Sequence, residues 1–170
     1  MKTYVMGNWK MNLTVGDSSI YLQRLLKKIK PTRGIEIIIA PSFISLASLS
    51  LQLERNKSKI KLAAQNFYQK DFGPYTGEVS TAMLAKLGCT YAVMGHSERR
   101  EYHGESDELV GAKARKVLDA GMTPILCCGE ALEIRKAGTH VDFVLGQIRA
   151  ALEGWSGEDV AKIVIAYEPI

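Results

Sequence analysis

The feature of this sequence that most constrains its fold is a pattern that repeats along the chain. Each repeat begins with a short apolar run rich in β-forming residues, continues through a polar loop and ends in an amphipathic helix. The apolar runs end near residues 8, 40, 65, 95, 127 and 168, so consecutive ends are 25 to 41 positions apart. This spacing is typical of βα units, because a hairpin needs only a few connecting residues. We therefore expect a parallel sheet, either closed into a barrel or doubly wound.

Six strands and five helical regions follow from this pattern. In the first helix, Ile20, Leu22, Leu25 and Ile29 recur at the spacing of one helix face. No Gly-x-Gly-x-x-Gly motif follows the first strand, which disfavours a dinucleotide-binding fold. The expected strands cover residues 4–8, 36–40, 61–65, 91–95, 124–127 and 162–167. The expected helices cover residues 17–29, 44–54, 81–87 and 107–120, with a fifth helical region between residues 130 and 152.

Length and composition bound the class of protein. A chain of 170 residues can bury one sizeable core, so we expect a single domain over residues 1–170. With 46% hydrophobic and 24% charged residues, the chain is typical of soluble globular proteins. The apolar runs are too short to cross a membrane and the first residues do not form a secretory signal, so we expect a cytoplasmic protein. The formal charge of +4 disfavours a nucleic-acid surface but suits an anionic small molecule.

The three cysteines are expected to be reduced and buried. An odd number of cysteines without regular spacing does not form a disulfide framework. Cys127 and Cys128 are neighbours, and together with His96 they lack the ligand spacing of a zinc site. We therefore expect no metal ion.

Polar side chains follow several of the expected strands at the point where each strand ends. Asn8 and Lys10 follow the first strand, His96 and Glu98 follow the fourth, and Glu168 follows the last. In βα units the carboxyl ends of the strands open into loops where side chains can meet a ligand. We therefore expect these five side chains to lie on one rim of the sheet.

Three of these segments resemble a known family. Residues 95–100 (Gly-His-Ser-Glu-Arg-Arg) resemble the histidine segment of triosephosphate isomerase, residues 7–12 (Gly-Asn-Trp-Lys-Met-Asn) match its opening motif, and residues 167–169 (Tyr-Glu-Pro) resemble the segment of its catalytic base. The resemblance implies a TIM (β/α)8 barrel. It also implies an isomerase of glycolysis and gluconeogenesis, which interconverts glyceraldehyde 3-phosphate and dihydroxyacetone phosphate through an enediolate.

The resemblance implies a role for each of the five residues. Glu168 matches the base and His96 the electrophile, an imidazole that the family keeps neutral with the amino terminus of a following helical turn. Lys10 matches the cation that holds the substrate and offsets the charge of the enediolate, Asn8 a substrate-binding amide, and Glu98 a carboxylate that pairs with the lysine. This chemistry implies no cofactor and no metal.

A further segment implies a partner. Residues 73–78 (Gly-Pro-Tyr-Thr-Gly-Glu) are similar to the loop with which one subunit of the family enters the other. The resemblance therefore implies a homodimer with Tyr75, Thr76, Gly77 and Glu78 at its interface.

The family's pattern continues past residue 170 through a lid and two more βα units. The resemblance thus implies an incomplete barrel of about six βα units with the sixth strand at the carboxyl terminus. We expect the isomerase activity of such a chain alone to be faint or absent, because the lid and the phosphate loops help to position the substrate and exclude water. The alternative is a noncatalytic barrel fragment that assembles with another chain through exposed sheet edges. A weaker third possibility is a different phosphosugar isomerase on the same scaffold.

Overall fold

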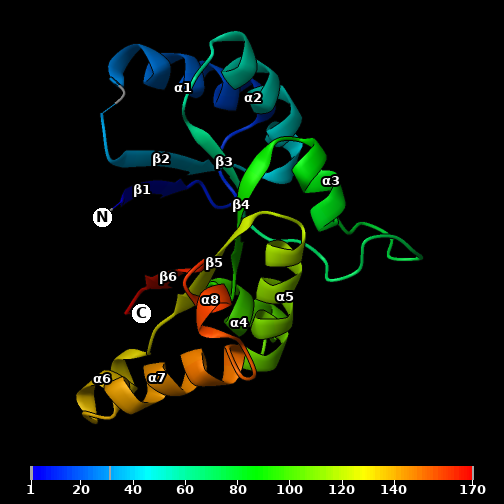
Figure 1. Cartoon of the computed structure of the whole chain (residues 1–170). Helices are drawn as coiled ribbons and strands as arrows, with labels where there is room; N and C mark the ends of the chain where they lie inside the picture. Colours follow the sequence, from blue (N-terminus) through cyan, green and yellow to red (C-terminus); the bar gives the residue numbers. More distant parts are fainter. Residues whose placement is uncertain (1, 31, 170) are drawn as a thin grey trace.

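In the computed structural model, which describes residues 2–30 and 32–169, six parallel strands form one sheet. The strand order β1-β2-β3-β4-β5-β6 follows the sequence without reversal, whereas a doubly wound sheet reverses at a switch point. The barrel type of α/β fold is therefore confirmed (Figure 1). Met1 and Ile170, the ends of the expected domain, lie outside the described residues. The strands are β1 (Thr3–Asn8), β2 (Ile35–Ala40), β3 (Lys61–Ala64), β4 (Cys89–Met94), β5 (Thr123–Cys128) and β6 (Val164–Tyr167).

Helices alternate with the strands as the repeat predicts. The fifth helical region is not one helix, because it is divided at Gly138, whose φ of 75° is left-handed. No described helix has the length and apolar character that crossing a membrane requires. The helices are α1 (Val15–Lys28), α2 (Phe43–Arg55), α3 (Thr81–Lys86), α4 (Ser97–His103), α5 (Asp107–Asp119), α6 (Leu132–Lys136), α7 (His140–Ala151) and α8 (Gly157–Val160).

Capping explains why α1 begins two residues before the start that its apolar pattern indicates. The hydroxyl of Thr14 accepts a hydrogen bond from the backbone N–H of Asp17 (3.3 Å) and donates one to the Asp17 carboxylate (2.6 Å). An N-cap of this kind satisfies an amide that the first turn leaves without a partner. Ser80, Ser106 and Ser156 accept hydrogen bonds in the same way at the starts of α3, α5 and α8.

The sheet curls, with the helices against its outer face (Figure 1), and strands β2 to β5 each contribute to two clusters of buried side chains. Between sheet and helices, strand residues such as Ile39 and Leu126 pack with Leu46 and Val110 of the helices. On the inner face, a smaller cluster consists of Ile38, Ala40, Ala63, Tyr91, Val93, Ile125 and Cys127.

Burial decreases towards the edges of the sheet. In the described residues β1 pairs only with β2 and β6 only with β5, so each has one free edge. Val5 of β1 is 53% exposed and Tyr167 of β6 is 49% exposed, whereas the central strand β4 is buried along nearly its whole length. A free apolar edge of this kind is a surface on which another strand can pair.

The long connection between β3 and α3 extends away from the rest of the molecule (Figure 1). Its base is closed by a hydrogen bond from the N–H of Tyr68 to the carbonyl of Val79 (2.8 Å). An ion pair between Asp71 and Lys116 ties the same loop to α5. The loop is thus anchored at its base, while its tip is exposed.

Helices α5 and α7 approach closely because one residue in their contact has no side chain. A Cβ placed on Gly111 of α5 would lie 2.2 Å from the carbonyl oxygen of Ala151, at the end of α7. The helix backbones could not come so near with a larger residue at this position. Gly146, in the middle of α7, has no atom within 4 Å of the position where its Cβ would be.

These two glycines yield opposite predictions. Gly111→Ala should lower the free energy of unfolding by about 1–3 kcal/mol, because the helices must move apart. Gly146→Ala should raise it by about 0.5–1 kcal/mol, because alanine favours the helix and meets no steric conflict. Urea unfolding of both variants measures the difference. A Gly111→Ala variant at least as stable as the parent protein would show that the close contact is not required.

Candidate active site

The structure brings the five predicted residues together at the carboxyl ends of the strands. The ammonium of Lys10 lies 2.7 Å from Oε1 of Glu98, and Oε2 of Glu98 lies 3.6 Å from Nδ1 of His96. On the other edge of the imidazole, Nε2 lies 3.7 Å from Oε2 of Glu168. Asn8 joins the same group, because its side-chain oxygen accepts a hydrogen bond from the N–H of Lys10 (3.0 Å). Four ionisable side chains thus form a continuous line across the rim.

His96 lies at the point where β4 passes into α4, and it is the N-cap of that helix. Its side chain is the least exposed of the four, and the whole residue is 8% exposed. Nδ1 accepts a hydrogen bond from the backbone N–H of Glu98 (3.3 Å). Since an acceptor nitrogen carries no proton, this geometry leaves the proton of a neutral imidazole on Nε2. The protonated edge of the ring then faces Glu168.

The backbone before His96 favours glycine. Gly95 has a left-handed φ of 68°, and a Cβ at this residue would lie 2.8 Å from Val110. Arg100 holds the same turn, since its Nε donates to the carbonyl of Gly95 (2.7 Å). The turn therefore fixes the direction in which His96 leaves the sheet.

The pair of Lys10 and Glu98 shifts the pKa of both groups. The hydrogen bond to Glu98 raises the pKa of the Lys10 ammonium above its usual value. The same hydrogen bond from Lys10 lowers the pKa of Glu98, against a smaller opposing effect of burial. Both side chains are nearly half exposed, so water screens the pair. At neutral pH the rim therefore carries a charged ammonium (Lys10) beside a charged carboxylate (Glu98).

Glu168 follows β6 and is tied to α4. Its backbone N–H donates to the carbonyl of Cys128 (2.9 Å), which extends the pairing of β5 and β6 by one residue. Its Oε1 accepts a hydrogen bond from the N–H of Ser97 (3.2 Å). The first amide of a helix favours a negative charge, so this contact holds the carboxylate next to His96.

A buried carboxylate that sequence reasoning missed supports this arrangement. Glu105 is 5% exposed, and its oxygens accept hydrogen bonds from the N–H of Gly95 (3.2 Å), from Arg99 (2.7 Å) and from Lys113 (2.6 Å). Lys113 also donates to Asn66, after β3 (2.6 Å). Burial alone would raise the pKa of Glu105, but the hydrogen bonds from Lys113 and Arg99 outweigh it and hold the pKa below its usual value. The network thus links α5 to the turn that carries His96.

A second residue that sequence reasoning missed is Gln65, directly after β3. Its side-chain amide donates to the backbone carbonyls of Lys10 (2.9 Å) and Ala40 (2.8 Å). Gln65 was the last residue of an expected strand, so its place on the rim was visible in the sequence. Its hydrogen bonds were not, because both partners are distant in the chain.

A cavity of about 620 Å³ opens beside these residues. A cavity of this size can hold a small ligand. Glu168 is not part of its wall and reaches His96 from the other edge of the ring. The hydroxyl of Ser42, which lines the cavity, is buried and has no hydrogen-bond partner among the residues that the structure describes. The wall consists of Asn8, Lys10, Met11, Asn12, Ser42, Phe43, Gln65, Asn66, His96, Glu98, Arg99, Tyr102 and His103.

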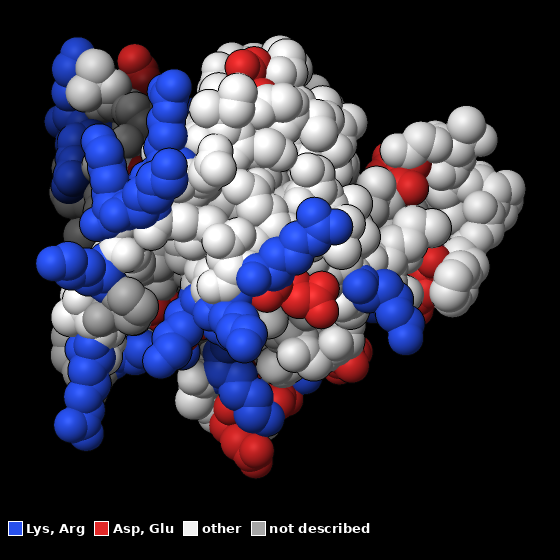
Figure 2. All heavy atoms as spheres, turned by 90° about the horizontal axis from the view of Figure 1, so that it is seen from above, with Lys and Arg blue, Asp and Glu red and all other residues white. Residues whose placement is uncertain are grey.

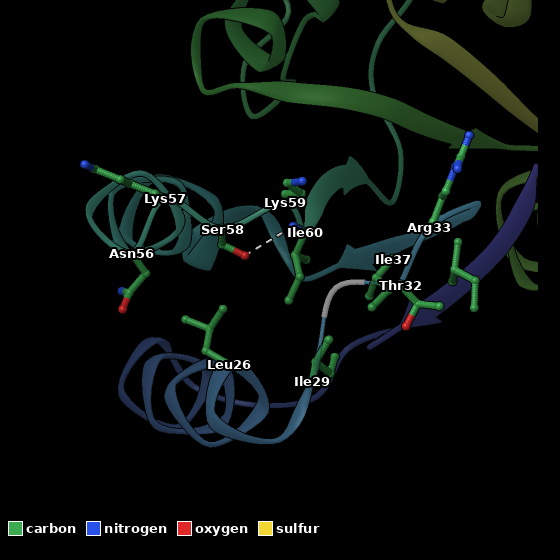
Figure 3. Close-up of a pocket in the computed structure, with 11 residues that line it drawn as sticks. Leu26, Ile29, Thr32, Arg33, Ile37, Asn56, Lys57, Ser58, Lys59 and Ile60 are labelled. Carbon is green, nitrogen blue, oxygen red and sulfur yellow. Dashed lines mark hydrogen bonds between the residues drawn. The ribbon is translucent and has the colours of Figure 1, made fainter.

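A different hollow of about 520 Å³ lies between α1 and the turn after α2, near the amino ends of β2 and β3 (Figure 3). Aliphatic side chains, among them Leu26, Ile29 and Ile60, form much of its lining. Lys57 and Arg33 also belong to the lining, but they extend away from the hollow rather than towards a common point (Figure 3). None of the residues predicted to act in catalysis lies there.

On one face of the molecule, positive charge is concentrated towards one side (Figure 2). On the face shown in Figure 2, Lys and Arg side chains gather towards the side on which α1 and β2 lie. The last turn of α1 carries Lys27 and Lys28. Cations at the carboxyl end of a helix are favoured by its dipole, which accounts for these two.

The four residues expected at a subunit interface lie apart from the cavity. They belong to the loop between β3 and α3, and none of them lines the cavity wall. Thr76, Gly77 and Glu78 are exposed, while Tyr75 packs against Tyr68 with ring centroids 4.7 Å apart. Within this chain the loop tip therefore completes no part of the site.

The cysteines are buried and free, as expected. Burial raises the pKa of Cys127 to about 12 and that of Cys89 to about 12. Their thiols therefore stay protonated at neutral pH, and Cys127 serves as a packing residue of the inner cluster.

The Glu105 network predicts a pH-dependent stability. Glu105→Gln should lower the free energy of unfolding by about 3–5 kcal/mol at pH 7, because it leaves Lys113 and Arg99 without their buried counter-ion. The folded pKa of Glu105 is lowered, so its stabilisation is complete above the unfolded pKa of about 4.3 and is lost as pH falls through the folded pKa. The difference between parent and variant should therefore shrink in acid.

Urea unfolding at pH 7 and at successively lower pH measures this difference. Glu101→Gln, at an exposed position of α4, is the control and should change stability by less than about 0.5 kcal/mol. A Glu105→Gln variant as stable as the control at pH 7 would contradict the role of the network.

Comparison with known proteins shows the family to which the chain is similar. A family model described as triosephosphate isomerase matches residues 3–170. The chain is 53% identical over 168 residues to the triosephosphate isomerase of Cutibacterium acnes, which covers 96% of this chain and 65% of the relative. It is 48% identical over 168 residues to that of Corynebacterium diphtheriae (98% and 65% covered) and 44% identical over 171 residues to that of Nocardia farcinica (99% and 66% covered).

The chain thus spans about 65% of the length of the first two of these curated relatives. The matched region includes every residue of the line from Lys10 to Glu168. The chain belongs to the triosephosphate isomerase family.

Proposed function

We propose that the protein catalyses the interconversion of glyceraldehyde 3-phosphate and dihydroxyacetone phosphate. The observation that carries this proposal is the placement of His96 between two carboxylates, with Nε2 towards Glu168 and Nδ1 bound to the amide of Glu98. This arrangement supplies a base and a neutral hydrogen-bond donor on one rim. The names of the relatives support the same activity.

In the proposed reaction, Glu168 removes a proton from the carbon next to the carbonyl of the substrate. The electron pair of the broken C–H bond forms the enediolate, and the N–H of His96 donates a hydrogen bond to the oxygen on which negative charge develops. The imidazole moves a proton between the two oxygens. Protonated Glu168 then returns its proton to the neighbouring carbon, so the substrate and product are isomers.

Lys10 has two tasks in this proposal. Its ammonium, which is protonated at neutral pH, attracts the phosphate of the substrate and stabilises the enediolate. Asn8 fixes the backbone of Lys10 and supplies an amide beside the substrate. Proton transfer next to a carbonyl proceeds with a base and electrophiles, so the proposal includes no cofactor and no metal.

The proposed activity predicts that Glu168→Gln removes the base and leaves the rest of the rim in place. We expect the exchange of the substrate's carbon-bound hydrogen with deuterated solvent, and the conversion of one triose phosphate to the other, to fall by about 10³-fold or to the rate of buffer. The exposed Glu153→Gln serves as the control and should keep the parent rate. NMR follows both reactions in one sample, and exchange is detectable even where net conversion is slow.

A Glu168→Gln variant that exchanges hydrogen faster than buffer and as fast as the control would contradict the proposal. A parent protein that exchanges hydrogen no faster than buffer would instead favour the alternative of a noncatalytic chain.

We also propose that the protein self-associates and works in the cytoplasm. The exposed tip of the loop that contains Tyr75, Thr76, Gly77 and Glu78 supports self-association, because Phe72 on the same loop is 78% exposed. The free edges of β1 and β6 support it as well, and they also suit the alternative of a noncatalytic chain that pairs with another. The free cysteines support a reducing compartment.

Sedimentation velocity tests the association. We expect a dimer or a larger assembly at micromolar concentration, and Phe72→Ser should shift the population towards the monomer. A compact monomer across this concentration range would contradict self-association.

A further inference from the structure

The side chain of Gln65 contacts the carboxyl ends of two strands, β1 and β2, to which Gln65 does not belong. It follows β3, yet its amide nitrogen donates to the carbonyl of Ala40, at the end of β2, and to the carbonyl of Lys10, after β1. Both of its amide hydrogens are therefore used. The carbonyl of Ala40 also accepts a hydrogen bond from the N–H of Trp9 (3.0 Å). Gln65 thus joins the carboxyl ends of three consecutive strands.

The residue that Gln65 holds has an unfavourable backbone. Lys10 has a φ of 53°, in the left-handed region, which is unfavourable for a residue with a Cβ. Such a conformation persists only where the surroundings impose it. At Lys10 the surroundings supply two hydrogen bonds, one from its N–H to Asn8 and one from Gln65 to its carbonyl. The peptide groups before and after Lys10 are therefore each held by a hydrogen bond.

The backbone of Lys10 decides where its ammonium lies. With the left-handed φ, the side chain reaches across the rim to Glu98, 88 positions later in the chain. A return to a negative φ would rotate the direction of the Cα–Cβ bond and carry the flexible side chain away from Glu98. Lys10 is nearly half exposed, so little packing would keep it in place.

We propose that Gln65 is a positioning residue, which holds the Lys10 peptide in its left-handed conformation and thereby directs the ammonium to Glu98 and the cavity. Its effect on catalysis rests on the proposed function, but its effect on the geometry of Lys10 does not. Gln65 is not a catalytic residue in this account, since it acts through the backbone of Lys10.

The test compares two variants. In each variant, methionine replaces one glutamine whose side-chain amide donates to a backbone carbonyl. Gln65→Met keeps the length of the side chain and removes both donors. Gln52→Met is the matched control, because Gln52 also donates to a backbone carbonyl, that of Ser19 (3.1 Å), but lies on α2 and does not line the cavity. Carbon-13 NMR of the Glu98 carboxyl reports the contact with Lys10, since the titratable groups that face Glu98 are Lys10 and His96.

In Gln65→Met we expect the pKa of Glu98 to rise towards its usual value, because the hydrogen bond from Lys10 is lost. In Gln52→Met it should stay at the parent value. A loss of global stability alone would not move this pKa in the folded molecules. If Gln65→Met fails to fold, Gln65→Asn decides, because the shorter side chain cannot reach both carbonyls. An unchanged pKa of Glu98 in the folded Gln65 variant would overturn the proposal.

Isomerase activity provides a separate readout. Where the parent is active, Gln65→Met should lower kcat/KM by roughly ten- to a hundredfold, as expected for a misplaced catalytic group. A parent without activity, combined with a raised pKa of Glu98 in Gln65→Met, would support the positioning role and favour the alternative of a noncatalytic chain over the proposed function. Lost activity with an unchanged pKa of Glu98 would refute the positioning role and leave the proposed function intact.

Discussion

The arrangement of the site depends on the hydrogen bond from the backbone amide of Glu98 to Nδ1 of His96. This bond fixes the rotation of the imidazole and places its proton on the edge that faces Glu168. It forms because His96 caps α4, and that helix begins directly after the left-handed Gly95. A single local constraint therefore sets both the orientation of the His96 ring and its tautomer.

Charged side chains that do not line the cavity, those of Glu105 and Arg100, hold the turn before His96 in place. Glu105 holds the N–H of Gly95 and the side chain of Arg99, while Arg100 holds the carbonyl of Gly95. The turn before His96 is therefore bound through both its donor and its acceptor. By contrast, Lys10 is held only through its own peptide and one exposed ion pair. We infer that His96 is the rigid part of the rim and Lys10 the part most easily displaced.

The sequence alone predicted the strands, their parallel pairing and the rim on which the polar residues meet, because hydrophobic periodicity and strand ends are local features. The start of α1 was placed too late, since the cap formed by Thr14 and Asp17 lies outside the apolar pattern. The sequence indicated one helical region between residues 130 and 152, without the division between α6 and α7 at Gly138. The roles of Gln65 and Glu105 could not be predicted, because their partners lie on other strands and helices and become neighbours only in the fold.

Nitrogen-15 NMR of the His96 ring at neutral pH tests the central claim most directly, because the two ring nitrogens give separate signals that show which of them carries the proton. The hydrogen bond from the amide of Glu98 predicts that the neutral ring carries its proton on Nε2, with Nδ1 unprotonated. A proton on Nδ1, in either the other neutral tautomer or the imidazolium, would contradict it, because the amide of Glu98 would then have no acceptor on the ring.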